Sequence, residues 1–169
     1  MPIHSRNADV SLNRMSSQIN QNAQSYLRTK IFTATPEQLQ LMLYDGAIRF
    51  AEQAKVALEK KDFESSYNLI SRTQKIITEL TGSLKHDVAP DLCGKLAALY
   101  NFVYRKLLEA NVGHEIEPMN EALSILRYQR ETWAMLLNQL GQQKAAVAAK
   151  RIDMPSPSAR MEASISMQG

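Results

Sequence analysis

Apolar residues recur at intervals of seven in two separate stretches of this chain of 169 residues. Because seven residues make nearly two turns of an α-helix, each series falls on one helical face. No stretch alternates apolar and polar residues in the way of a half-buried strand. We therefore expect long helices that bury these faces against one another. The two series are Phe63, Ile70, Ile77 and Leu84, and Met119, Leu126, Trp133 and Leu140.

Helix start signals divide the periodic region into four helices. Residues 35–38 read Thr-Pro-Glu-Gln, a capping-box pattern that begins a helix. Asp62 is placed to cap a second helix, and Pro90 and Pro118 stand at the front of two more, where a missing N–H costs nothing. The connections are short, which favours antiparallel neighbours. The expected fold is all-α, an antiparallel up-down four-helix bundle.

The ends of the chain differ in composition from the periodic middle. Residues 1–25 are rich in Asn, Gln and Ser, and residues 144–169 carry two prolines and four serines. Such segments bury too little apolar surface to fold alone. We expect disordered extensions over these two ranges, around a bundle over residues 26–143 that begins with a cover segment at residues 26–34.

The net charge of +3 does not come from the helical region. Residues 31–143 hold 12 basic and 14 acidic residues, so the positive excess lies in the two ends. A nucleic-acid-binding domain concentrates Lys and Arg on its folded face, so we expect no nucleic-acid partner. No apolar run is long enough for a membrane span, and the first 25 residues lack the apolar region of a signal peptide. We expect a cytoplasmic protein with no membrane insertion.

No pattern for catalysis or metal binding is visible in the sequence. A di-iron site in a helix bundle needs Glu three residues before His, and none of His4, His86 and His114 meets this condition. Cys93, the single cysteine, cannot form an internal disulfide and is expected to be a small buried residue. We expect no catalytic residue, no metal and no cofactor, and we interpret the chain as a binding module rather than an enzyme.

Two of the expected helices are apolar over more of their circumference than a bundle requires. Either the segment at residues 26–34 folds over the additional apolar surface, or an amphipathic helix of another protein occupies it as a groove. Both interpretations hold if the segment at residues 26–34 covers the groove until the ligand displaces it. The additional apolar residues include Leu41, Tyr44 and Ile48 in the first helix, and Tyr100, Tyr104 and Leu108 in the third.

Specific strings of residues between positions 26 and 138 carry a family resemblance. Residues 33–39 read Thr-Ala-Thr-Pro-Glu-Gln-Leu, and residues 41–50 read Leu-Met-Leu-Tyr-Asp-Gly-Ala-Ile-Arg-Phe. With Tyr26 before them, these strings closely resemble the opening of the flagellin-specific secretion chaperones, the FliS family. Shorter matches follow in the order of that family at residues 74–80, 99–102, 109–111 and 130–133.

The resemblance implies a four-helix bundle that acts as a cytoplasmic chaperone in bacterial flagellar export. Members of the family bind the disordered C-terminal segment of newly made flagellin, keep it from polymerising and help present it to the cytoplasmic domain of the export gate. The resemblance also implies that Tyr26 and Ile31 belong to the segment that covers the groove. We expect a monomer or weak dimer when the chain is free. The candidate groove residues are Leu41, Tyr44, Ile48, Tyr100, Tyr104 and Leu108.

Two other functions stay open at this point. The wide apolar faces also suit a structural or adaptor bundle that associates with itself. The other alternative is an enzyme whose active site has no recognisable sequence pattern. Because Tyr44 is expected outside the core, Tyr44→Asp is expected to weaken flagellin binding and to spare the fold. Ile77→Asp, in contrast, is expected to unfold the bundle because it buries an unpaired charge.

Overall fold

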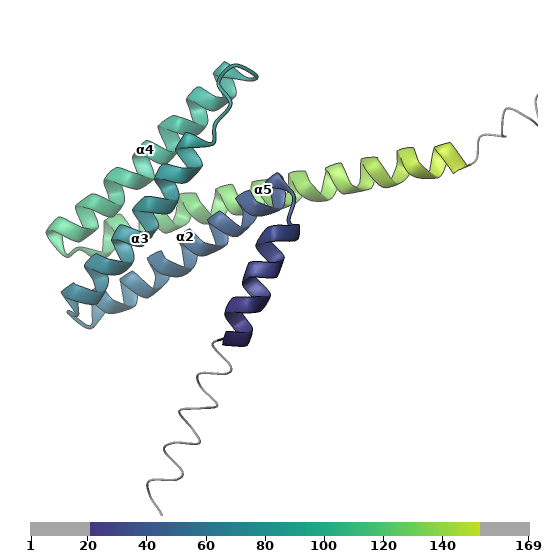
Figure 1. The fold of residues 1–169 in the computed structure, drawn as a ribbon. Coiled ribbons are helices and arrows are strands. Elements are labelled where there is room, and N and C mark those ends of the chain that lie inside the picture. Colours follow the sequence, from purple (N-terminus) through teal and green to yellow (C-terminus); the bar gives the residue numbers. More distant parts are fainter. Residues whose placement is uncertain (1–20, 153–169) are drawn as a thin grey trace, which may run out of the picture. The chain divides into compact units, whose positions relative to one another are not determined.

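The computed structural model describes residues 21–152 of the chain, with side chains up to residue 149. Every regular element in these residues is an α-helix, which confirms the all-α class. A helical segment at residues 21–33 precedes four longer helices, so this part of the chain has one helix more than expected (Figure 1). The longer helices are α2 (Pro36–Glu59), α3 (Phe63–Gly82), α4 (Pro90–Gly113) and α5 (Ile116–Ile152).

The chain separates into two compact units, and the boundary between them falls inside α2. The first unit is Met1–Met42 and the second is Leu43–Gly169. The described part of the first unit comprises the helical segment at residues 21–33 and the first turns of α2. The second unit holds the rest of α2 together with α3, α4 and α5, and its described residues contain the buried core.

The helix start signals act as the sequence predicts. The amide N–H of Gln38 donates to the Thr35 hydroxyl at 3.3 Å, and the amide N–H of Thr35 donates to the Gln38 side-chain oxygen at 3.0 Å. These two bonds complete the capping box of α2. The Asp62 carboxylate caps α3 by accepting a hydrogen bond from the Ser65 amide at 3.1 Å. The first residues of α2 and α3 are therefore fixed by local chemistry.

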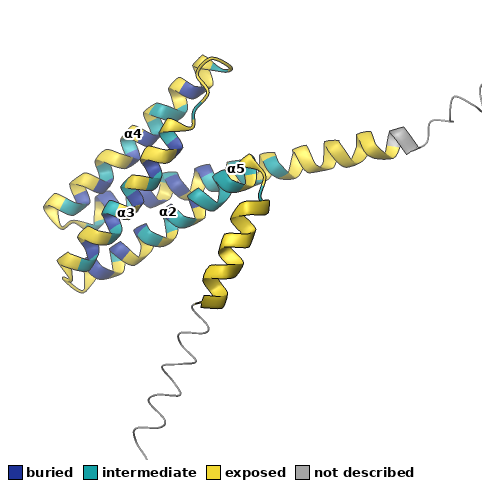
Figure 2. Cartoon of the chain, in the orientation of Figure 1, coloured by how far each residue is buried: buried dark blue, intermediate teal, exposed yellow. Residues whose placement is uncertain are grey.

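The core of the second unit is built from one buried face of each helix (Figure 2). Ile70 and Ile77 of α3 and Leu126 of α5 are at most 1% exposed, so these members of the seven-residue series face the core as expected. Trp133 packs against the same cluster, which confirms it as a core residue. Cys93 is buried, as expected of a small apolar residue.

Tyr44 and Tyr100 lie inside this core, and the prediction that they face outward is wrong. Each side chain is 1% exposed, and their hydroxyl groups are hydrogen-bonded to each other between α2 and α4. The error has a geometric cause. Because α2 contacts α3, α4 and α5, its buried arc extends beyond the stripe of about 100° that a simpler contact needs. Phe50, which ends the string at residues 41–50, is only partly buried, beneath the guanidinium groups of Arg49 and Arg72.

Two ion pairs connect α2 to α5 on the surface of the second unit. Asp45 pairs with Arg130, and Glu52 pairs with Arg127, each at 2.8 Å. All four side chains are about half exposed, so each pair contributes at most about 1 kcal/mol to stability. The ion pairs orient α2 along α5, and the buried core supplies most of the stability.

The last part of α5 extends beyond the core. The described side chains from Asn138 to Ala149 are all exposed, so the expectation that Leu140 is buried is wrong. Core contact along α5 ends near Leu137, which is partly buried. Residues 144–149 read Lys-Ala-Ala-Val-Ala-Ala, and alanine has the highest helix propensity of all residues. Local propensity therefore accounts for the helix here, where no core packs against it.

The expected disordered extensions lie mostly outside the described residues, at 1–20 and 153–169. Where the structure does describe them, residues 21–25 belong to a helical segment and residues 144–152 belong to α5. Both helices therefore run past the boundaries expected from composition. Within residues 21–152, no helix combines the length and the apolar character that crossing a membrane requires.

Tyr44→Asp is expected to destabilise the protein about as much as Ile77→Asp, by several kcal/mol, because each variant places a carboxylate in the core. Thermal unfolding followed by circular dichroism measures the loss. Tyr44→Phe keeps the ring and removes only the hydroxyl, so it should cost about 1 kcal/mol. A Tyr44→Asp variant that melts like the unchanged chain would contradict the buried position of Tyr44.

The Asp62 cap is expected to make stability depend on pH. Hydrogen bonds from Ser65 hold the pKa of the Asp62 carboxyl below its usual value. A carboxyl with a lowered folded-state pKa stabilises the fold above its usual pKa, and this contribution is lost as the pH falls through the lowered value. Asp62→Ala should therefore lower Tm at pH 7 and have a smaller effect below about pH 4. Asp62→Asn keeps a capping oxygen that does not titrate, so its Tm should stay closer to that of the unchanged chain at pH 7.

Candidate functional site

The candidate groove residues of the second unit differ widely in exposure. Tyr44 and Tyr100 form the buried pair, and Ile48 is partly buried against the edge of the core. Tyr104 and Leu108 are 40% and 48% exposed, so they are available to a partner. The exposed candidates therefore lie on α4, and this helix is the starting point for the site.

Tyr104, Leu108 and Val112 form an exposed apolar row on α4. They follow one another at intervals of four residues, so they lie along one side of the helix. Lys106 lies on the opposite side, since its amino group contacts the carboxylate of Glu121 in α5 at 3.2 Å. The row is therefore directed away from α5, toward α3, which also packs along α4.

Two exposed aromatic residues lie near the beginning of α3, which lies against the end of α4. Phe63 is 42% exposed and Tyr67 is 58% exposed. The ring of Phe63 stacks on the ring of His114, with 4.0 Å between the ring centroids, so the beginning of α3 lies against the end of α4. We define the α3–α4 surface as Phe63, Tyr67, Tyr104, Leu108 and Val112.

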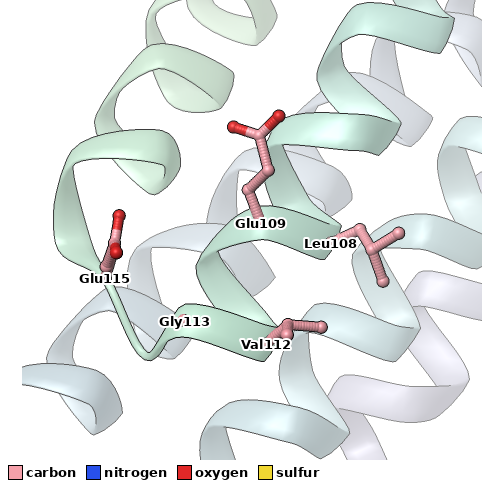
Figure 3. Close-up of a pocket in the computed structure, with 5 residues that line it drawn as sticks. All are labelled: Leu108, Glu109, Val112, Gly113 and Glu115. Carbon is pink, nitrogen blue, oxygen red and sulfur yellow. The ribbon is translucent and has the colours of Figure 1, made fainter.

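A pocket of about 430 Å³ lies at the C-terminal end of α4 and shares Leu108 and Val112 with the α3–α4 surface (Figure 3). Leu108 and Val112 give it apolar walls, Gly113 ends the helix beside them, and Glu109 and Glu115 supply carboxylates. In Figure 3 the side chains of Leu108 and Val112 extend from the same side of α4, whereas the two carboxylates extend in another direction. The pocket thus offers an apolar face to an incoming side chain.

Ion pairing offsets part of the negative charge beside this pocket. The amino group of Lys106 contacts the carboxylates of Glu109 at 2.9 Å and Glu121 at 3.2 Å. Hydrogen bonds to Glu109, and then to Glu121, raise the pKa of Lys106, so this side chain keeps its charge throughout the neutral range. Because Lys106 offsets the charge of Glu109, the α3–α4 surface is mainly apolar in character.

Three members of the α3–α4 surface were not among the candidate groove residues. The sequence pattern placed Phe63 and Tyr67 on the face of their helix that packs in the core, which is wrong for both, and Val112 was not chosen as a groove residue. A usable signal was available for Phe63, which follows the predicted cap Asp62 and so stands at the end of a helix, where fewer neighbours can cover a side chain.

The remaining predicted site residues lie in the first unit. Tyr26 and Ile31 belong to the helical segment at residues 21–33 and are 69% and 44% exposed. Leu41 is partly buried in the early part of α2. The assignment of Tyr26 and Ile31 to a cover segment stays a prediction.

The described histidines lie in loops rather than in a metal site. His86 is exposed between α3 and α4, and His114 stacks on Phe63, while His4 lies outside the described residues. Within residues 21–152, no group of three or more His, Cys, Asp or Glu side chains is arranged to hold a metal ion.

Known proteins resemble this chain both in fold and in sequence. A crystal structure of a flagellar chaperone from bacteria matches the fold with a TM-score of 0.59 at 19% identity, over 70% of this chain and 98% of that one. The flagellar secretion chaperone FliS of Bacillus subtilis (strain 168) is 31% identical over 109 residues, which are 64% of this chain and 80% of that protein.

A second relative and a family model extend this result. The flagellar secretion chaperone FliS of Campylobacter jejuni is 28% identical over 114 residues, which are 68% of this chain and 89% of that protein. The family model described as flagellar protein FliS matches residues 18–140, which include α2, α3, α4 and most of α5. The chain therefore belongs to the FliS family of flagellar secretion chaperones.

Proposed function

We propose that this protein binds the disordered C-terminal segment of newly made flagellin, prevents its premature polymerisation and helps deliver it to the cytoplasmic domain of the export gate. Membership of the FliS family supports a chaperone function. The observation that carries the proposal is the α3–α4 surface, because contiguous exposed apolar side chains mark interaction sites. Binding of this kind needs no catalytic residue, so we propose a chaperone of the bacterial cytosol that is not an enzyme.

The spacing along α4 suits an amphipathic helical ligand. Tyr104, Leu108 and Val112 span eight residues, or about 12 Å at 1.5 Å per residue. This length corresponds to about two turns of a ligand helix, whose own apolar residues recur every three or four positions. Because a disordered segment loses entropy when it becomes ordered, such a surface can be large and still release its ligand.

We also propose that the four longer helices form an antiparallel up-down bundle. The stacking of Phe63 on His114 supports this arrangement, because it joins the beginning of α3 to the end of α4. The proposal keeps Tyr26 and Ile31 in a segment that covers the groove until flagellin displaces it. The free chain is then a monomer or weak dimer.

Leu108→Asp is expected to weaken binding of a synthetic flagellin C-terminal peptide by at least tenfold, because it places a charge in the apolar row. Isothermal titration calorimetry measures the affinity. The side chain is 48% exposed, so Tm should change little. A gain of helicity with a negative heat-capacity change on binding is expected when the peptide folds on the surface.

Val88→Asp is the matched control for this experiment. Val88 is 73% exposed in the loop before α4, far along the chain from Leu108, and the substitution introduces the same charge. It should leave the affinity for the peptide unchanged. If the unchanged protein releases or absorbs no heat on titration with the peptide, flagellin binding is contradicted. If both variants lose the same amount of affinity, the α3–α4 surface is not the binding site.

Light scattering without peptide tests the self-associating bundle. Growth in particle size with protein concentration would favour that alternative.

A further inference from the structure

The apolar line along α5 continues past the end of the core. Leu126 is 1% exposed and Trp133 packs against the core cluster, whereas Leu140 is 37% exposed and Val147 is 56% exposed. These four residues are spaced by seven, so they lie on one line along the helix. Leu136, which is 41% exposed, lies beside the same line. The face that α5 uses to pack in the core is therefore repeated on its exposed half.

The exposed half of α5 lies largely beyond the region that the family model matches. The match ends at residue 140, and α5 continues to Ile152. The α3–α4 surface lies within the matched region, so the two surfaces are separate. A function of this part of α5 therefore does not depend on the function proposed above.

The charges beside the line are all positive. Residues 132–152 contain no Asp or Glu. Lys144 stands four residues after Leu140, in an exposed part of α5. In a pair of helices, residues at this position flank the apolar contact, and their charges select the partner.

We propose that residues 136–149 of α5 dock an amphipathic helix of another protein, whose apolar stripe is flanked by Asp or Glu. The stripe of the partner packs on Leu136, Leu140 and Val147, which continues the packing line of the core. The acidic flank pairs with Lys144. The apolar contact supplies most of the affinity, and the charges supply the choice of partner.

The same observations disfavour two other occupants. A second copy of α5 brings no acidic residue to the contact, because residues 132–152 contain none. A membrane surface suits a helix with a broad apolar face. Here the exposed side chains of Gln139 and Gln143 border the apolar line on one side, and Lys144 borders it on the other, so the line is narrow.

The test uses the full chain and two synthetic helical peptides of about three heptads. Both peptides carry the same leucine stripe, and its flanks carry Glu in one peptide and Lys in the other. Fluorescence anisotropy at low salt should give about tenfold tighter binding for the Glu peptide, and added salt should reduce the difference. Equal binding of the two peptides, or no binding of either, would overturn the proposal.

Three variants locate the contact. Lys144→Glu should weaken binding of the Glu peptide about tenfold and strengthen binding of the Lys peptide. Lys95→Glu makes the same change of charge at an exposed position of α4 and should alter neither affinity. Val147→Asp should remove binding of the Glu peptide without lowering Tm, because Val147 is 56% exposed. Equal effects of Lys144→Glu and Lys95→Glu would show that total charge, rather than this face, determines binding.

Two further measurements test the other occupants. Sedimentation of the chain with phosphatidylserine vesicles tests the membrane surface, and light scattering over a range of concentrations tests the second copy. We expect the chain not to sediment with the vesicles. We also expect no concentration-dependent growth in particle size that the Val147→Asp substitution abolishes. Vesicle binding lost in Val147→Asp would assign this face to a membrane, and self-association lost in the same variant would assign it to a second copy.

Discussion

The contact between the Tyr44 and Tyr100 hydroxyls determines which faces of α2 and α4 are buried. Both rings are too large to enter the core unless the neighbouring residues of α2 are small, and Ala47, Ala51 and Ala54 are all fully buried beside Tyr44. The alanines let the backbone of α2 approach the other helices, and the two tyrosines fill the remaining space. Because each hydroxyl has the other as a partner, two polar groups are buried without a large cost.

The same contact accounts for the exposed surface of α4. With Tyr100 inside, the rotation of α4 is set, and Val103 and Leu107 follow it into the core. Tyr104 and Leu108 then fall at the edge of the buried face, where they are 40% and 48% exposed. The α3–α4 surface is thus a consequence of how the core packs, since its residues on α4 occupy the positions that the core does not use.

Local signals were sufficient to predict most of the fold. The capping box at Thr35 and the cap at Asp62 involve residues only three apart, and they begin α2 and α3 where the sequence indicates. The burial of Tyr44 was predicted incorrectly, because periodicity alone does not give the width of the buried arc of α2. That width depends on Tyr100, which lies in another helix and is distant in the sequence. No local pattern contains that information.

The candidate site was predictable only in part, for a related reason. Tyr104 and Leu108 were identified because α4 has more apolar residues than its core contacts require. Phe63 and Tyr67 stand near the beginning of α3, where exposure depends on how the helix ends meet, and a periodicity of seven does not report where neighbouring helices stop. The continuation of α5 past residue 143 was missed because alanine propensity, rather than contact with the core, sustains the helix there.

The Ala-rich end of α5 has a consequence for how this protein can change over time. Its side chains bury nothing in the core, so most substitutions there alter the free energy of unfolding very little. Selection for stability, which limits change at positions such as Tyr44, does not act on this stretch. Substitutions in the extension can therefore change which partner it contacts without a compensating change in the core.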